Sequence, residues 1–232
     1  MMKWTLERRA DPSRLALAMA PLAAVACTLL VGMLLVAWAG APVGQTYTLL
    51  FDGAFGSRFA LSETLTRATP LMLTGLACAV AFRARLFNIG AEGQLYMGAL
   101  AAVAVGGMHG GAAFDLPTPV LFAGMMAAAA LAGALLLLIP ALLKSRFGVD
   151  EVVTTLLGNF IVLLFVSMML DGPMKDPMAM GWPQSVALNP DLELGKLIER
   201  TRAHTGLLWA AGLALGLWLL NRYTVFGFQM RA

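Results

Sequence analysis

The polar residues most able to do chemistry lie in one short stretch, residues 83–98, between two apolar runs. It reads Arg-Ala-Arg-Leu-Phe-Asn-Ile-Gly-Ala-Glu-Gly-Gln-Leu-Tyr-Met-Gly. Charged and amide side chains are costly inside a bilayer, so they usually face a bundle interior, a cavity or a transport pathway. If a helix begins at Asn88, then Asn88, Glu92 and Tyr96 share one face at i, i+4 and i+8. We therefore predict that this stripe, together with Gln94, points away from lipid and lines a substrate path.

Glu92 is the one acidic residue inside a predicted membrane span, and its role is open. The carboxylate could contact a substrate or relay protons. Alternatively it is structural, either paired with Arg85 one heptad earlier on the same face or hydrogen-bonded to a neighbouring helix.

A second polar pair, Thr155 and Asn159, lies in a later apolar run. Residues four apart are neighbours on a helix surface. The pair could form interhelical hydrogen bonds, which average about 0.6 kcal/mol in a membrane protein, or it could line a pore. Both residues are therefore further candidates for the substrate path.

The composition indicates an integral membrane protein. The chain is 59% hydrophobic and 12% charged, whereas soluble domains average about 25% charged residues. Apolar runs of helical length recur, unlike the short alternating segments of an outer-membrane barrel. The fold class is therefore predicted to be all-α and polytopic. The net charge of +3 arises from basic residues at helix ends, so no nucleic-acid binding is expected.

No residue pattern typical of an enzyme is present in the sequence. It lacks a Gly-x-x-x-x-Gly-Lys phosphate loop, so this chain is not expected to hydrolyse ATP. His109 and His204 have no acid or nucleophile beside them, and Cys27 and Cys78 lie in apolar runs without metal-ligand spacing. We expect no catalytic residue, no cofactor and no metal.

Six apolar runs are predicted to cross the membrane, at 15–38, 65–82, 87–105, 120–143, 152–170 and 206–220. The first is longer than the usual signal-peptide core of about 7–15 residues, so a retained helix is preferred to a cleaved signal. Residues 39–67 are predicted to form an external loop with a short interfacial helix near 47–55.

Basic residues indicate the orientation of these spans. The segments predicted to lie inside carry Lys3, Arg8, Arg9, Arg14, Arg83, Arg85, Lys144, Arg146, Arg222 and Arg231. Lysine and arginine are enriched in short cytoplasmic loops. The segments 1–14 and 221–232 are therefore both predicted to be cytoplasmic.

The stretch 87–94, Phe-Asn-Ile-Gly-Ala-Glu-Gly-Gln, resembles the signature of ABC importer permeases for simple sugars and nucleosides, the branch served by basic-membrane-protein-type (guanosine-type) binding lipoproteins. Further stretches resemble the same family in the right order, namely 7–14, 142–159, 171–173 with 182–185, and 224–232. The resemblance thus spans nearly the whole chain.

This resemblance implies a transmembrane subunit of a binding-protein-dependent importer in the bacterial plasma (inner) membrane. Its implied partners are an ABC ATPase, a second permease that is identical or different, and an extracytoplasmic substrate-binding protein that meets the external loops. Residues 221–232 would begin a cytoplasmic coupling segment that receives force from the ATPase. The candidates for that contact are Arg222, Phe226, Gly227, Gln229 and Arg231.

Two other function classes are alternatives to a permease. A proton-coupled secondary transporter working through Glu92 would need further intramembrane acids or histidines that form a relay. A non-catalytic membrane scaffold or an intramembrane enzyme, the second alternative, would need a catalytic pair in adjacent spans, such as serine with lysine or two aspartates. The predicted spans offer neither a relay nor such a pair. In the family the coupling segment continues with further helices, so we expect this sequence to be the first part of a longer protein.

Overall fold

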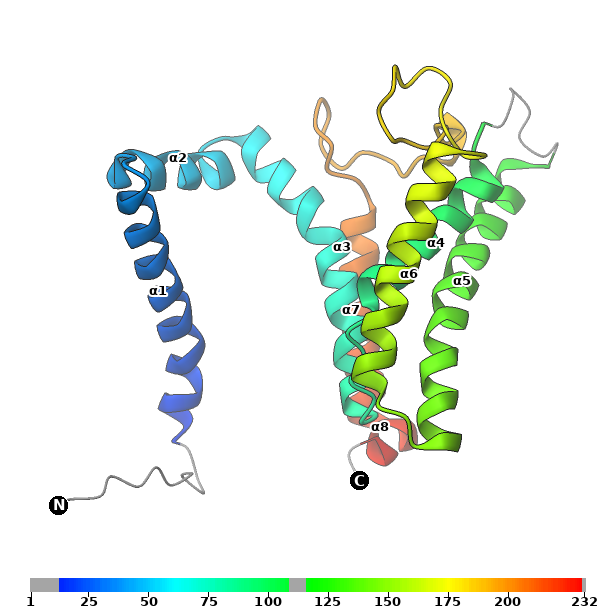
Figure 1. The fold of residues 1–232 in the computed structure, drawn as a ribbon, viewed down its shortest axis with the longest axis horizontal. Coiled ribbons are helices and arrows are strands. Elements are labelled where there is room, and N and C mark those ends of the chain that lie inside the picture. Colours follow the sequence, from blue (N-terminus) through cyan, green and yellow to red (C-terminus); the bar gives the residue numbers. More distant parts are fainter. Residues whose placement is uncertain (1–12, 109–115, 231–232) are drawn as a thin grey trace. The chain divides into compact units, whose positions relative to one another are not determined.

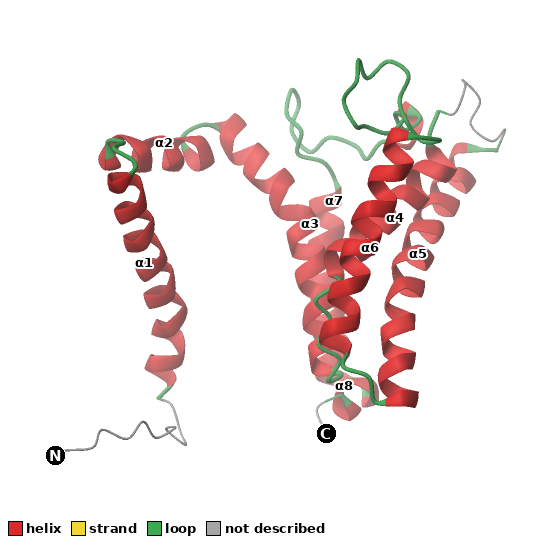
Figure 2. Ribbon diagram, in the orientation of Figure 1, coloured by secondary structure: helices red, strands yellow, loops and turns green. Residues whose placement is uncertain are grey.

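The computed structural model describes residues 13–108 and 116–230, and within them the chain is helical without a β-strand (Figures 1 and 2). The predicted all-α class is confirmed. The elements are α1 (Arg14–Trp38), α2 (Val43–Phe55), α3 (Arg58–Arg83), α4 (Ala91–Gly106), α5 (Thr118–Phe147), α6 (Glu151–Asp171), the short 3₁₀ helix η1 (Pro190–Leu192), α7 (Gly206–Tyr223) and α8 (Val225–Gln229).

The chain divides into two units, Met1–Leu61 and Ser62–Ala232. In the first unit, α1 begins at an N-cap in which the Ser13 hydroxyl accepts from the Ala16 amide at 3.2 Å. α2 contacts α1 through the Tyr47 hydroxyl, which donates to the Leu29 carbonyl at 2.7 Å. Gly32 makes room for this contact, because a Cβ there would lie 2.7 Å from the Tyr47 hydroxyl oxygen.

In the second unit, α4, α5 and α6 pack against one another (Figure 1). Small residues bring the backbones of α4 and α5 together. A Cβ at Gly98 would lie 3.2 Å from the Ala129 carbonyl oxygen, and a Cβ at Gly133 would lie 3.4 Å from that of Gln94. Close approach at small residues is the usual way in which membrane helices associate.

Residues 172–205 connect α6 to α7, and we call them the 172–205 segment. Leu192 of η1 packs in it against Leu121 and Met125 of α5, and all three are buried. The Met108 amide donates to the Ala187 carbonyl at 2.9 Å. These contacts hold the segment on one end of the helices, opposite the end where α8 lies (Figure 1).

Four described segments are long and apolar enough to cross a membrane: Ala18–Trp38, Arg58–Arg83, Thr118–Phe147 and Glu151–Asp171. Three of them contain the predicted spans 65–82, 120–143 and 152–170, and the first overlaps all but three residues of span 15–38. The remaining two, 87–105 and 206–220, fall on α4 and α7, helices of 16 and 18 residues that do not meet this criterion.

Helix bounds differ from the sequence prediction at several places, and two of these differences concern the polar stretches. The helix that contains span 65–82 already begins at Arg58, because Ser57 caps it by accepting from the Ala60 amide at 3.0 Å. The hydroxyls of Thr66 and Thr69 donate to carbonyls of their own helix, so these polar groups have partners within it. The second difference concerns Asn88, which precedes α4. The predicted Asn88–Glu92–Tyr96 helix face is therefore wrong at its first member.

Candidate functional site

The residues that lead from α3 into α4 are not helical, and Asn88 lies at their centre. Its side chain is only 1% exposed. Its Oδ1 accepts from the Gly90 amide at 2.9 Å and from Gln94 Nε2 at 3.2 Å, while its Nδ2 donates to Gln94 Oε1 at 3.2 Å. The structure thus brings two of the predicted site residues, Asn88 and Gln94, into a reciprocal amide pair that fixes the first turn of α4.

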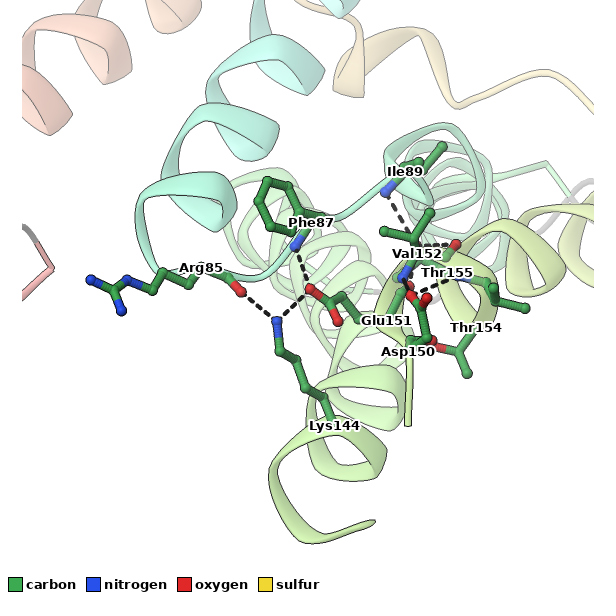
Figure 3. A network of polar contacts seen from close by, with 10 residues as sticks. Arg85, Phe87, Ile89, Lys144, Asp150, Glu151, Val152, Thr154 and Thr155 are labelled. Carbon is green, nitrogen blue, oxygen red and sulfur yellow. Dashed lines mark hydrogen bonds and ion pairs between the residues drawn. The ribbon is translucent and has the colours of Figure 1, made fainter. Parts of the chain in front are cut away.

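A row of three α6 side chains, Glu151, Thr155 and Asn159, supplies acceptors to this connection. We call it the acceptor row. Glu151 Oε1 accepts from the Phe87 amide at 3.2 Å, and Thr155 Oγ1 accepts from the Ile89 amide at 3.2 Å (Figure 3).

Asn159 Oδ1 completes the row by accepting from the Gly93 amide. Spacing of four residues places the three acceptors on one face of α6. The first amides of a helix have no hydrogen-bond acceptor within it. The side chains of α6 therefore supply acceptors to amides at the start of α4 and in the residues that lead into it.

Glu92 lies in the first turn of α4, where a carboxylate is favoured by the helix dipole. Its Oε2 accepts from Asn159 Nδ2 at 3.4 Å. A hydrogen bond to a neighbouring helix was one of the structural roles left open by the sequence. The shared helix face assumed for pairing with Arg85 does not exist, since Arg85 lies in a turn with φ of 58°.

Lys144, in the last turn of α5, joins α5 to α6 and to the α3–α4 connection (Figure 3). Its Nζ donates to the Arg85 carbonyl and forms an ion pair with Glu151. The same Nζ lies 5.9 Å from the centroid of the Phe87 ring. The Glu151 side chain is 9% exposed and that of Lys144 is 35% exposed, so this node ties three helix ends together with little water around the carboxylate.

Neither Lys144 nor Glu151 is among the site residues predicted from the sequence. The available signal was their position: each stands at a helix end, on either side of the short α5–α6 turn. Opposite charges so placed can meet when two helices pack antiparallel.

A cavity of about 280 Å³ lies between the start of α4, the C-terminal half of α5 and the N-terminal half of α6. Three predicted path residues, Gln94, Thr155 and Asn159, line it, whereas Asn88, Glu92 and Tyr96 do not. The lining is otherwise largely aliphatic, because α5 contributes leucine, isoleucine and proline side chains. Glu92 and Tyr96, four residues apart on α4, are both exposed.

The predicted coupling residues lie at a sharp corner between α7 and α8. Gly227 is buried there, and a Cβ at this position would lie 2.2 Å from the Asn221 carbonyl oxygen. Thr224 caps α8 by accepting from the Gly227 amide at 3.3 Å. Only a residue without a side chain fits this corner.

The other coupling candidates surround the corner. Phe226 and Gln229 are exposed on α8, and the Arg222 guanidinium lies 5.5 Å from the Trp218 ring centroid. Arg231 lies outside the described residues. Among described residues there is no group of three or more His, Cys, Asp or Glu able to hold a metal ion.

Comparison with known proteins places these features in a family. Residues 60–232 match the family described as branched-chain amino acid transport system / permease component. The chain is 36% identical to the guanosine ABC transporter permease protein NupP of Bacillus subtilis over 94% of its length. It is 35% identical to the glucose ABC transporter permease protein TsgB13 of Haloferax volcanii over 96% of its length.

A nucleoside ABC transporter permease protein of Lactococcus lactis, NupB, is 27% identical over 91% of the chain. The aligned regions cover 62%, 60% and 59% of these three relatives, so the chain spans less than two thirds of their length. No solved structure matches the chain. The match over 60–232 and the identity to these permeases establish that the chain belongs to the branched-chain amino acid transport system permease component family.

Proposed function

We propose that the protein is a transmembrane permease subunit of an ATP-driven, binding-protein-dependent importer that takes up nucleosides or simple sugars. The observation that carries this proposal is family membership together with relatives named as ABC transporter permeases for guanosine, glucose and nucleosides. The chain itself is non-catalytic in this proposal, and a separate ATPase hydrolyses ATP. A second permease subunit completes the path, and an extracytoplasmic binding protein delivers the substrate.

The proposed topology has six spans with both ends in the cytoplasm of a bacterial cell. Its support is the distribution of charge in the second unit. Arg83, Lys144 and Arg222 lie in the last turns of α3, α5 and α7, at the same end as α8 (Figure 1). Basic residues favour the cytoplasmic side, so the α8 end is inside and the 172–205 segment is outside.

We assign the substrate path to the α4–α6 region. Asn88, Gln94, Thr155 and Asn159 are engaged in the bonds that hold the start of α4. Their proposed role is therefore to shape the wall of the path. Glu92 and Tyr96 are exposed, and in this proposal they face the passing solute.

Coupling to the ATPase is assigned to the α7–α8 corner. Closure of an ATPase dimer would bias a bundle with two discrete arrangements, open to opposite sides. The exposed Phe226 and Gln229 would contact the ATPase, together with Arg222 beside them. Gly227 lets α8 lie directly against the end of α7, so a push on α8 moves α7.

The test uses the complete transporter, with its ATPase and binding protein, reconstituted in proteoliposomes. Uptake of labelled guanosine and ribose is measured with and without ATP. We expect ATP-dependent uptake that Gly227→Ala abolishes, because the added Cβ would collide with the Asn221 backbone. The matched control is Gly216→Ala on α7, where a Cβ meets nothing within 4 Å. Uptake that ignores ATP, follows a proton gradient and fails in Glu92→Gln would refute the proposal.

A further inference from the structure

A second cavity, of about 410 Å³, lies between the first turns of α5 and the 172–205 segment. None of the predicted path or coupling residues lines this cavity. Its floor is formed by Phe122, Met125, Leu188 and Leu192. This volume falls in the usual range of small-molecule sites, about 300–1,000 Å³, which are mostly apolar with a few polar groups.

The floor is preformed. Met125 and Leu192 are 6% and 2% exposed and belong to the same buried cluster. Gly106 of α4 lies directly beneath them, since a Cβ there would be 2.8 Å from Met125 Sδ and 2.9 Å from Leu192 Cδ1. A ligand that settles on this floor therefore does not need to order it.

The rim is polar and carries both donors and acceptors. Glu193, Lys196, Thr201 and His204 line it. His204 Nδ1 accepts from the Gly206 amide at 3.1 Å, which leaves Nε2 as the N–H donor of a neutral imidazole. Arg202, also on the rim, lies 3.9 Å from Glu63 on α3.

We propose that this cavity binds a nucleoside and is the first site that the substrate occupies on the outer side of the permease. The inference rests on the proposed function for its orientation and its solute. Thioethers and an aromatic ring suit the flat face of a base, and the Glu193 carboxylate and the His204 and Lys196 donors suit ribose hydroxyls.

Other solutes fit this arrangement less well. A free sugar has no base to cover the apolar floor. An aliphatic amino acid is much smaller than the cavity and leaves most of the floor uncovered.

The site is tested by ligand protection of an introduced cysteine in the complete transporter. Met126, on α5, lines the cavity and is 54% exposed. Met126→Cys is made in a Cys27→Ala/Cys78→Ala background and labelled with a membrane-impermeant maleimide. The control is Met178→Cys in the same background, because Met178 is 82% exposed on the 172–205 segment and does not line the cavity.

At guanosine concentrations about ten times the dissociation constant, mass action predicts that labelling of Met126→Cys slows about tenfold. Labelling of Met178→Cys stays unchanged, and ribose or leucine at the same concentration leaves both rates unchanged. Equal labelling of Met126→Cys with and without guanosine overturns the site. Equal protection by leucine or ribose overturns the nucleoside assignment, and protection at Met178→Cys overturns its location.

ATP-dependent uptake is measured on the same preparations. Uptake of guanosine without protection of Met126→Cys removes this site and leaves the importer standing. Protection without ATP-dependent uptake removes the importer and leaves a nucleoside site.

Discussion

The acceptor row of α6 gives a sharp prediction, because two adjacent threonines differ in what they bind. Thr155 Oγ1 bonds to carbonyls of its own helix and also accepts from the Ile89 amide. Thr154 Oγ1 bonds only to the Asp150 and Glu151 carbonyls of its own turn. Thr→Val replaces a hydroxyl by a methyl group at either position. Only Thr155→Val removes a partner from another segment.

The expected cost follows from the group that is left without a partner. A buried donor that loses its acceptor costs about 1–3 kcal/mol, and interhelical hydrogen bonds measured in a membrane protein average about 0.6 kcal/mol with a maximum near 1.7. The Ile89 amide is partly buried, so we expect Thr155→Val to lower the free energy of unfolding by about 1 kcal/mol. Thr154→Val is expected to stay within about 0.5 kcal/mol of the parent.

Unfolding is followed by denaturant titration in mixed micelles, with helix content as the signal. Amide hydrogen exchange of the peptide that contains Ile89 is the local measurement. In Thr155→Val this peptide exchanges faster, by about fivefold for a loss of 1 kcal/mol. In Thr154→Val it keeps the parent rate.

Equal destabilisation by the two substitutions would refute the acceptor row as a clamp on α4. So would unchanged exchange at Ile89 in Thr155→Val. Either result would mean that the threonine hydroxyls act only within α6.

Two further predictions test the same region. Lys144→Met or Glu151→Leu alone is expected to destabilise the protein more than the double substitution, because removing one partner leaves the other charge unpaired in a half-buried node. The same denaturant titration measures all three variants. A double variant as unstable as the sum of the two single variants would contradict this coupling. Gly93→Ala is expected to lower the free energy of unfolding by about 1–3 kcal/mol, since the new Cβ would lie 2.6 Å from Asn159 Oδ1. Gly158→Ala, where a Cβ meets nothing within 4 Å, is expected to raise it by about 0.5–1 kcal/mol through helix propensity. Thermal melting in detergent compares the two variants, and the reverse order of stability would disprove the close contact at Gly93.

The helices could be predicted from the sequence because their causes are local. Long apolar runs, with serine or aspartate caps at Ser13 and Asp150, make α1 and α6 helical whatever surrounds them. The motif at 87–94 also indicates the family without reference to any tertiary contact. A left-handed Gly148, with φ of 65°, ends α5 as such residues commonly do.

The start of α4 was decided by tertiary structure. The sequence alone favoured a helix from Phe87, since an unpaired backbone amide is costly in an apolar medium. In the fold, Glu151 and Thr155 accept from the amides of Phe87 and Ile89, which lie 64 and 66 residues earlier in the chain. These bonds allow residues 87–90 to remain non-helical and move the first helical residue to Ala91.

The sequence by itself determined that the chain forms apolar helices, because hydrophobic length and capping act over neighbouring residues. It also named most of the polar residues of the site. Which of them meet was decided only by packing: Asn88 with Gln94, Glu92 with Asn159, and Lys144 with Glu151. Hydrogen bonds between distant segments depend on the relative position of whole helices, and that position is set by close contacts such as Gly98 on Ala129.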